Sequence, residues 1–188
     1  MQVLQLTREG MPSAWLSPRE AAMYYATDSI CWTMGDVCTT LRGGMNSVTG
    51  TQSRLDIHPI IAVNGVSSIN LFDITPTLTN DKLFARDRWT CAYCGSVHPG
   101  GIGLTRDHIC PRGQDGEDVF SNVISACRGC NHFKACRTPE QARMPLLFAP
   151  YTPSVFEDFL LKGRNVQGEA YDFLTSRVSK NSRWYTVH

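Results

Sequence analysis

Two pairs of cysteines share a spacing that suits a metal ion. Cys91 and Cys94 form the first Cys-x-x-Cys, and Cys127 and Cys130 form the second. Two intervening residues let both sulfurs of a pair reach one ion from a tight turn, and four thiolates complete a tetrahedral shell around zinc at about 2.3 Å. Such a shell has no position left for water, so it stabilises a fold without doing chemistry. We therefore predict a structural zinc site, in preference to four free cysteines or a redox pair.

Polar residues of other types lie between these pairs and directly after them. Asp107 and His108 are adjacent in the run L-T-R-D-H-I at 104–109, Asn122 precedes the second pair, and Asn131 follows Cys130. Carboxylate and amide oxygens suit a hard divalent cation, and a neutral imidazole can accept a proton near pH 7. This set indicates hydrolysis at a metal centre, where a cation stabilises charge on a phosphate.

Together with the run C-R-G-C-N-H-F-K at 127–134, these residues resemble the HNH endonuclease family in its four-cysteine zinc subclass, over roughly residues 84–137. The resemblance implies a ββα-metal fold and hydrolysis of DNA phosphodiester bonds, by nicking or by double-strand cleavage. It implies that His108 is the general base and that Asp107 and Asn131 hold a catalytic Mg²⁺ or Mn²⁺. Asn122 then ties down the loop between the two strands. Asn131 stands where the family's name has His, so the neighbouring His132 stays open as the last ligand.

Basic residues accompany this motif. Lys134, with Arg112 or Arg137, is predicted to hold flanking phosphates, and DNA is the predicted partner. The formal net charge of the whole chain is only +1, so we expect no strong field that steers DNA to the protein. A non-catalytic zinc-binding module that binds nucleic acid, and an RNA nuclease, remain alternatives. One active centre cuts one strand, so a homodimer also stays open.

The unpaired cysteines, the N-terminus and the hydropathy of the chain predict the cellular compartment in which the protein works. Four further cysteines lack the paired spacing and are predicted to be free, mostly buried thiols: Cys31, Cys38, Cys110 and Cys136. The N-terminus has neither the basic start nor the apolar core of a signal peptide, and no run of about 18 apolar residues predicts a membrane span. We therefore expect a cytoplasmic protein of a bacterial or phage-infected cell, with reduced thiols and no membrane partner.

A hairpin and a helix must position the polar residues of the motif. Leu104–Ile109 and Val123–Ala126 are predicted strands joined by a loop, and a helix that starts at the second cysteine pair carries Asn131 and Lys134 on one face. Adjacent strand residues point to opposite faces of a sheet. Asp107 and His108 can therefore face one site only if the strand ends or twists between them.

The whole chain is predicted to be α+β in three regions. Residues 1–75 form a small α+β region, residues 76–143 the zinc-stabilised nuclease core, and residues 144–188 a helical buttress. The expected strands of the first region are Gln2–Thr7, Ser29–Met34, Arg54–His58 and Ile60–Val63, with a helix from Pro18 to about Thr27 that Ser17 and Glu20 cap. Gly43, Gly44, Asn46 and Gly50 predict a loop, and Pro59 predicts an edge or a bend.

Four further segments are predicted to be helical or to turn. Thr79 caps a helix over Asn80–Asp87, Thr138 opens a turn or helix, and Ser154 caps a helix that runs to Gly163. The last helix contains Ala170, Phe173, Leu174 and Val178.

Overall fold

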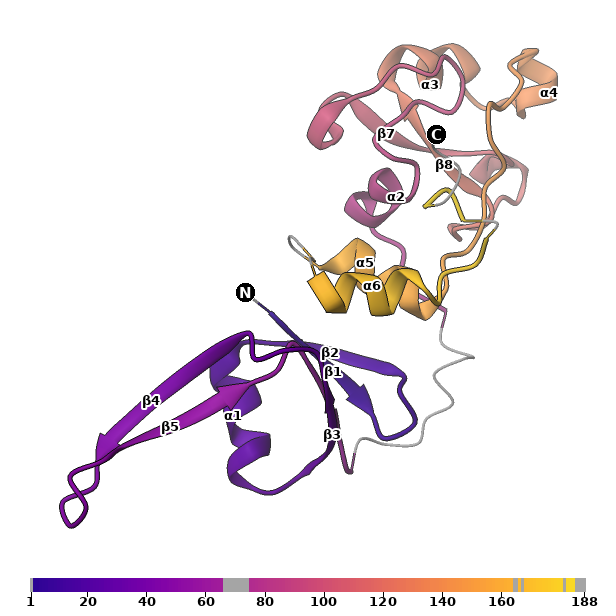
Figure 1. Cartoon of the computed structure of the whole chain (residues 1–188). Helices are drawn as coiled ribbons and strands as arrows, with labels where there is room; N and C mark the ends of the chain where they lie inside the picture. Colours follow the sequence, from indigo (N-terminus) through magenta and orange to yellow (C-terminus); the bar gives the residue numbers. More distant parts are fainter. Residues whose placement is uncertain (1, 66–74, 164–165, 167, 181, 185–188) are drawn as a thin grey trace. The chain divides into compact units, whose positions relative to one another are not determined.

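The computed structural model describes residues 2–65, 75–163, 166, 168–180 and 182–184. Its contacts divide the chain into two compact units, Met1–Ile74 with Gly163–Arg177 and Thr75–Lys162 with Val178–His188. The segment that the sequence presents as one C-terminal buttress is thus shared between the units. Helices and sheets occur in both units, which confirms the predicted α+β class (Figure 1). No described helix is long and apolar enough to cross a membrane.

A four-stranded sheet forms the centre of the first unit. Its order is β2-β1-β6-β3, and β1 and β6 run parallel whereas the other neighbours are antiparallel. The strands are β1 (Val3–Thr7), β2 (Pro12–Leu16), β3 (Ile30–Met34) and β6 (Ile60–Val63). All four residues of β6 are buried in the middle of the sheet, so Pro59 marks a bend before this strand rather than a sheet edge. Strand β2 was not predicted from the sequence.

Helix α1 (Pro18–Ala26) packs on this sheet and begins where the sequence predicts. The Ser17 hydroxyl accepts a hydrogen bond from the Glu20 amide at 3.3 Å, and the Ser17 amide donates to the Glu20 carboxylate at 2.7 Å. This reciprocal pair satisfies two amides that the first helical turn leaves without a partner. Ala21 then lies in the apolar core beside Val3 and Ile61.

The predicted loop around Gly43 and Gly44 is wrong, because both glycines belong to a strand. β4 (Thr39–Met45) pairs with β5 (Gln52–Ile57) in a separate antiparallel hairpin whose register shifts between Arg42 and Met45. Leu41 and Leu55 pack against the core at the base of this hairpin. An irregular register accommodates the two glycines, and the turn lies only beyond Met45.

Helix α6 (Gly168–Thr175) belongs to the first unit. It buries Ala170, Phe173 and Leu174 as predicted, whereas Val178 lies beyond its end. Its Glu169 accepts a hydrogen bond from the Asp36 amide at 2.9 Å.

The second unit has the predicted order of strand, loop, strand and helix. β7 (Leu104–His108) and β8 (Val123–Cys127) form an antiparallel hairpin, and α3 (Arg128–Lys134) follows without a break. The helix begins at Arg128, within the second cysteine pair, as predicted. Short 3-10 turns occur at Pro99–Gly101 and Arg112–Gln114. The surrounding helices are α2 (Asn80–Arg86), α4 (Pro139–Ala142) and α5 (Val155–Lys162), with Thr79 and Thr138 as the expected caps of the first two.

A buried guanidinium joins three segments of this unit. Arg86, at the end of α2, is 1% exposed, and its Nε and Nη2 donate to the Asp87 carboxylate at 2.8 and 3.1 Å. Its remaining N–H groups donate to the carbonyls of Phe120, Val123 and Tyr151 at 2.7 to 2.9 Å. All five donors of the side chain are therefore satisfied. The Asp87 carboxylate in turn accepts from the Ser125 amide of β8 at 2.7 Å.

We expect Arg86→Met to destabilise the second unit by about 3–5 kcal/mol, because the Asp87 charge and three carbonyls would stay buried without their donor. Denaturant unfolding of the full chain, followed by tryptophan fluorescence, measures this loss. Arg19→Met on the exposed face of α1 is the control, with a change below about 0.5 kcal/mol. Equal stabilities of the two variants would contradict the structural role of Arg86.

Candidate active site

The four paired cysteines meet at one point of the second unit. Their sulfur atoms all lie within 4.8 Å of one another, and those of Cys94 and Cys127 are 3.9 Å apart. Ligands of a tetrahedral zinc ion at 2.3 Å are about 3.8 Å apart, so this cluster fits the predicted structural site. In the part of the chain that the structure describes, no other group of three or more Cys, His, Asp or Glu side chains is arranged in this way.

The environments of these thiols differ. Burial raises the pKa of Cys91 and of Cys130, whereas hydrogen bonds from Ser96 lower the pKa of Cys94 to about 6. A thiol must lose its proton to bind zinc, so metal binding would release protons from Cys91 and Cys130.

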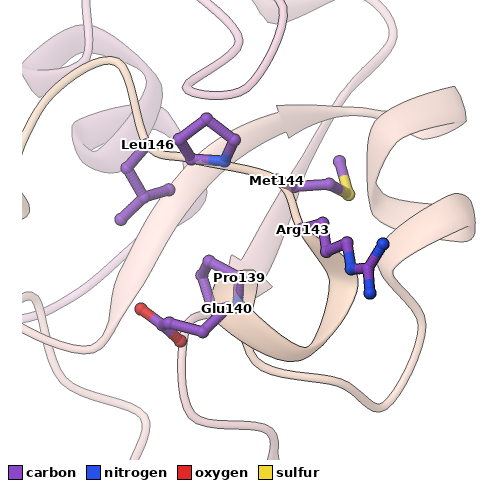
Figure 2. A pocket seen from close by; sticks show the side chains of 6 residues that line it. Pro139, Glu140, Arg143, Met144 and Leu146 are labelled. Carbon is purple, nitrogen blue, oxygen red and sulfur yellow. The ribbon is translucent and has the colours of Figure 1, made fainter.

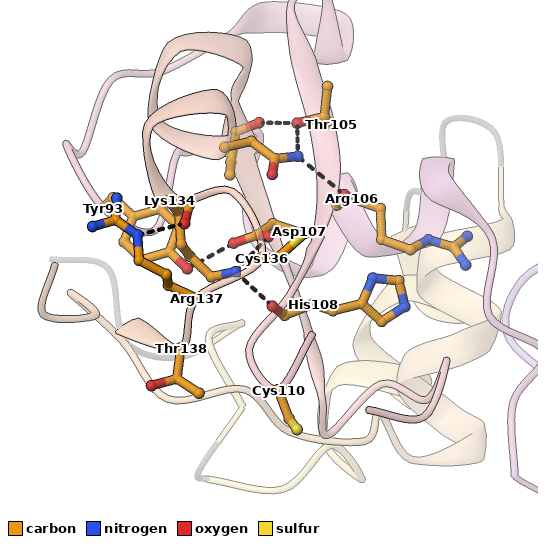
Figure 3. Close-up of polar contacts among 12 residues, drawn as sticks. Tyr93, Thr105, Arg106, Asp107, His108, Cys110, Lys134, Cys136, Arg137 and Thr138 are labelled. Carbon is orange, nitrogen blue, oxygen red and sulfur yellow. Dashed lines mark hydrogen bonds and ion pairs between the residues drawn. The ribbon is translucent and has the colours of Figure 1, made fainter. Parts of the chain in front are cut away.

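Asp107 points to the face of the hairpin that α3 covers. It is 4% exposed, and its carboxylate accepts from the Lys134 ammonium at 2.9 Å and from the Tyr93 hydroxyl at 2.7 Å (Figure 3). Burial, together with this bond to the carboxylate, raises the pKa of Tyr93, which therefore stays a hydrogen-bond donor. The sequence analysis missed Tyr93, which lies inside the first Cys-x-x-Cys and is positioned by the cysteine turn.

Lys134 is buried in the structure, whereas the sequence analysis expects it on a phosphate. Its side chain is 1% exposed, and its ammonium donates to the Asp107 carboxylate and, at 2.8 Å, to the His108 carbonyl. Two other basic residues of the prediction, Arg112 and Arg137, are exposed. Arg137 stacks over Phe133 and donates to the Lys134 carbonyl at 3.1 Å, which holds it beside the end of α3.

Asn131 lies on the side of α3 that contacts β7. Its Nδ2 donates to the Thr105 hydroxyl at 2.9 Å and to the Arg106 carbonyl at 3.3 Å. These bonds fix the amide plane, and no described residue donates to its Oδ1. A carboxylate oxygen of Asp107 and this amide oxygen are chemically suited to a hard divalent cation. The alternative ligand His132 is exposed on α3.

His108 points away from Asp107, to the opposite face of the hairpin. Pairing stays regular to the end of β7, with Asp107 opposite Ile124 and His108 opposite Val123. The strand thus ends at His108, but no twist brings the two side chains to one face. The link between them runs through Lys134, which contacts the side chain of Asp107 and the backbone of His108 (Figure 3).

Asp118 holds the imidazole of His108 in place. Its carboxylate contacts His108 Nε2 at 3.0 Å and accepts from Arg106 Nη1 at 2.6 Å, and Arg106 also donates to Asn80 at 2.9 Å. The hydrogen bond from Arg106 lowers the pKa of Asp118, so this carboxylate is ionised and only accepts. Nε2 must therefore carry the proton, which leaves Nδ1 as the basic nitrogen of a neutral ring. Residues two apart on a strand point to the same face, so the sequence could have shown that Arg106 lies beside His108. No sequence signal indicates that Asp118 contacts His108.

Asn122 is hydrogen-bonded to the loop between the two strands. Its Oδ1 accepts from the Cys110 amide at 2.9 Å, and its Nδ2 donates to the carbonyls of Cys110 and Glu117 at 3.1 and 2.8 Å. Gly116 passes so close to the Cys110 carbonyl that a Cβ atom would overlap it. The loop is thus closed directly after His108, and the contact lies on Cys110 rather than on the histidine backbone.

A pocket of about 470 Å³ lies apart from the predicted site residues. It is lined by residues of α4 and of the segment after it: Pro139, Glu140, Arg143, Met144, Pro145 and Leu146 (Figure 2). It contains no predicted catalytic or metal-binding residue.

Residues 91–135 match the family model described as HNH endonuclease. The match covers all four cysteines, Asp107, His108, Asn122, Asn131 and Lys134, and it indicates a nuclease. No match was found among curated proteins or among solved structures.

We expect removal of zinc to unfold the second unit. Structural zinc sites bind with about 10–16 kcal/mol, which equals or exceeds the net stability of a typical domain at about 5–15 kcal/mol. Chelation, or Cys91→Ser, should abolish the near-UV circular dichroism of the unit and release bound zinc, measured by plasma emission spectroscopy. Cys31→Ser in the first unit is the control and should change neither signal. A folded, soluble, zinc-free Cys91→Ser chain would contradict the assignment.

Proposed function

We propose that the protein is a metal-dependent endonuclease that hydrolyses phosphodiester bonds in DNA, because residues 91–135 match the HNH endonuclease family model. The observation that carries this proposal is the arrangement on the hairpin and α3. Asp107 and His108 end β7, Asn131 lies on α3, and Cys127 and Cys130 of the four-cysteine cluster lie where β8 meets α3.

Asp107 and Asn131 are proposed to hold a divalent Mg²⁺ or Mn²⁺ ion. When bound, the ion stabilises charge on the phosphate and on the leaving oxygen. The Lys134 ammonium pairs with the buried Asp107 carboxylate in the structure, and an opposite charge compensates part of the cost of burying a carboxylate. Tyr93 limits the freedom of the same carboxylate through its hydroxyl. The chain thus holds this carboxylate in a fixed position as an oxygen ligand for a hard cation.

His108 is proposed to act as the general base. Asp118 accepts the hydrogen bond from the Nε2–H group of the ring. The other ring nitrogen, Nδ1, is then the one that takes a proton from the attacking water. Asn122 supports this role by closing the loop that follows the strand. Arg112 and Arg137 are exposed and are proposed to hold flanking phosphates of the substrate.

One such centre cuts one strand at a time. A single chain therefore nicks DNA, and cleavage of both strands requires a homodimer or two successive visits. We propose that the protein works in the cytoplasm of a bacterial or phage-infected cell, where its eight cysteines stay reduced.

Plasmid cleavage tests the nuclease and its base together. We expect zinc-loaded protein to nick supercoiled plasmid with Mg²⁺ or Mn²⁺ and not with EDTA, and His108→Ala to lower the rate about 10²–10⁴-fold. His132→Ala is the control, and a loss of cleavage in that variant would move the last ligand from Asn131 to His132. No cleavage by the folded, zinc-loaded parent would favour a non-catalytic nucleic-acid-binding module, and cleavage of matched RNA alone would favour an RNA nuclease.

Replacement of Asp118 tests the orientation of the base. Asp118→Asn should lower kcat at least about tenfold, because a misplaced catalytic group loses rate, with KM for DNA unchanged or lower since a negative charge is gone. The nitrogen chemical shifts of His108 should report a mixture of tautomers in the variant and a single Nε2–H tautomer in the parent. Asp115→Asn, an exposed carboxylate of the same loop, is the matched control. A faster Asp118→Asn enzyme would show that the contact restrains His108 instead of positioning it.

A further inference from the structure

We propose that the β4–β5 hairpin of the first unit is a DNA-binding ribbon that contacts the duplex through Arg42 and Arg54. The hairpin is anchored at its base, where Leu41 and Leu55 pack on the core. Beyond that point it extends away from α1 and the sheet of its own unit (Figure 1). The nuclease motif does not include any part of it.

Every residue from 42 to 54 is exposed. This segment contains two arginines and no acidic residue, and its other side chains are mostly Ser, Thr, Asn and Gln. Arg, Ser, Thr, Asn and Gln are the side chains that donate hydrogen bonds to phosphate and sugar oxygens. A solvated surface strand normally mixes both signs of charge, so the composition favours a polyanion as the partner.

The two arginines are placed directly opposite each other. Arg42 pairs with Arg54 in the β4–β5 register, and neither side chain has an ion-pair partner among the described residues. Asp56, two residues after Arg54 on the same strand, accepts a hydrogen bond from Thr40 across the ladder at 2.6 Å. Like charges directly opposite on a sheet destabilise it. An anion bound between the arginines removes this cost, and a phosphodiester backbone supplies such anions at regular intervals.

The shape of the hairpin favours duplex DNA over the other polyanions. A two-stranded β-ribbon fits the major groove of B-form DNA, whereas the major groove of A-form RNA is too narrow for side chains to read. Gly43 and Gly44 follow Arg42 and have no side chains, so the sugar-phosphate backbone of DNA can approach the strand closely at this point. This inference rests on the proposed function, in which DNA is the substrate. It adds a second surface that contacts DNA, outside the nuclease motif.

Binding of a short fluorescent DNA duplex to the full chain tests the proposal. All variants carry His108→Ala, so the probe is not cut, and anisotropy is measured over a range of salt concentrations. Arg42→Ala with Arg54→Ala should weaken binding about 10- to 100-fold near 0.1 M salt and reduce the slope of log K against log salt by about 2. Arg42→Lys with Arg54→Lys should recover most of this loss, because the charge is kept.

The matched control removes the same charge elsewhere on the first unit. Arg8 and Arg19 are exposed and lie outside the hairpin, so the double alanine variant of these residues should bind DNA like the parent. The hairpin variant should also keep or raise its melting temperature, because a like-charge pair has been removed, which excludes misfolding as the cause of weaker binding.

Three results would overturn the proposal: unchanged DNA binding by the hairpin variant, an equal loss in the Arg8 and Arg19 control, or an equal loss of binding to an RNA duplex of the same sequence.

Plasmid cleavage by chains with the native His108 is measured separately. A chain that binds DNA through the hairpin but cuts nothing would refute the proposed nuclease alone, and a chain that cuts DNA with no contribution from the hairpin would refute this inference alone.

Discussion

The second unit depends on the buried guanidinium of Arg86. A charge inside a protein is tolerable only when it is paired and its donors are satisfied, and here one side chain meets both conditions with groups from three segments. Asp87 supplies the opposite charge, while the carbonyls of Phe120, Val123 and Tyr151 take the remaining donors. The start of β8 is therefore fixed to α2 by polar contacts of defined direction. Apolar packing alone would allow the hairpin to slide, whereas this network fixes its position.

The four-cysteine cluster lies at the other end of β8, where a bound zinc ion would be the second fixed point. Cys127 ends this strand and caps α3, so one residue joins the cluster, the hairpin and the helix. The apolar cluster here is small and includes Cys91, Leu104 and Ala126. The unit also buries Leu83, Phe120 and Ile124, and a bound zinc ion would add to this apolar core at the junction of β8 and α3. Near this junction the Asp107 carboxylate and the Lys134 ammonium form a buried ion pair between β7 and α3.

Features set by neighbouring residues were predictable from the sequence. The Ser17 and Thr79 caps, the zinc cysteines and the order of the hairpin and α3 follow from local spacing and were found correctly. Features set by distant residues were not predictable. Gly43 and Gly44 suggest a loop because glycine weakens strands, and only the pairing with β5 shows that they lie in one. In the same way, the burial of Lys134 depends on how α3 meets β7, and the contact of Asp118 with His108 depends on how the loop folds back.

The alternation of side chains along β7 divides the site into two faces, and this division limits how the chemistry can work. Asp107 shares the helix side with Lys134 and Asn131 lies on the packed face of α3, whereas His108 shares the other side with Arg106 and Asp118. If β7 continued beyond His108, the sheet would separate the side chains of its two faces along the whole strand. The chain instead leaves the sheet after His108, where Asn122 and Gly116 close the loop around Cys110. We propose that the site uses groups from both faces at this end of β7, because the strand stops directly after Asp107 and His108.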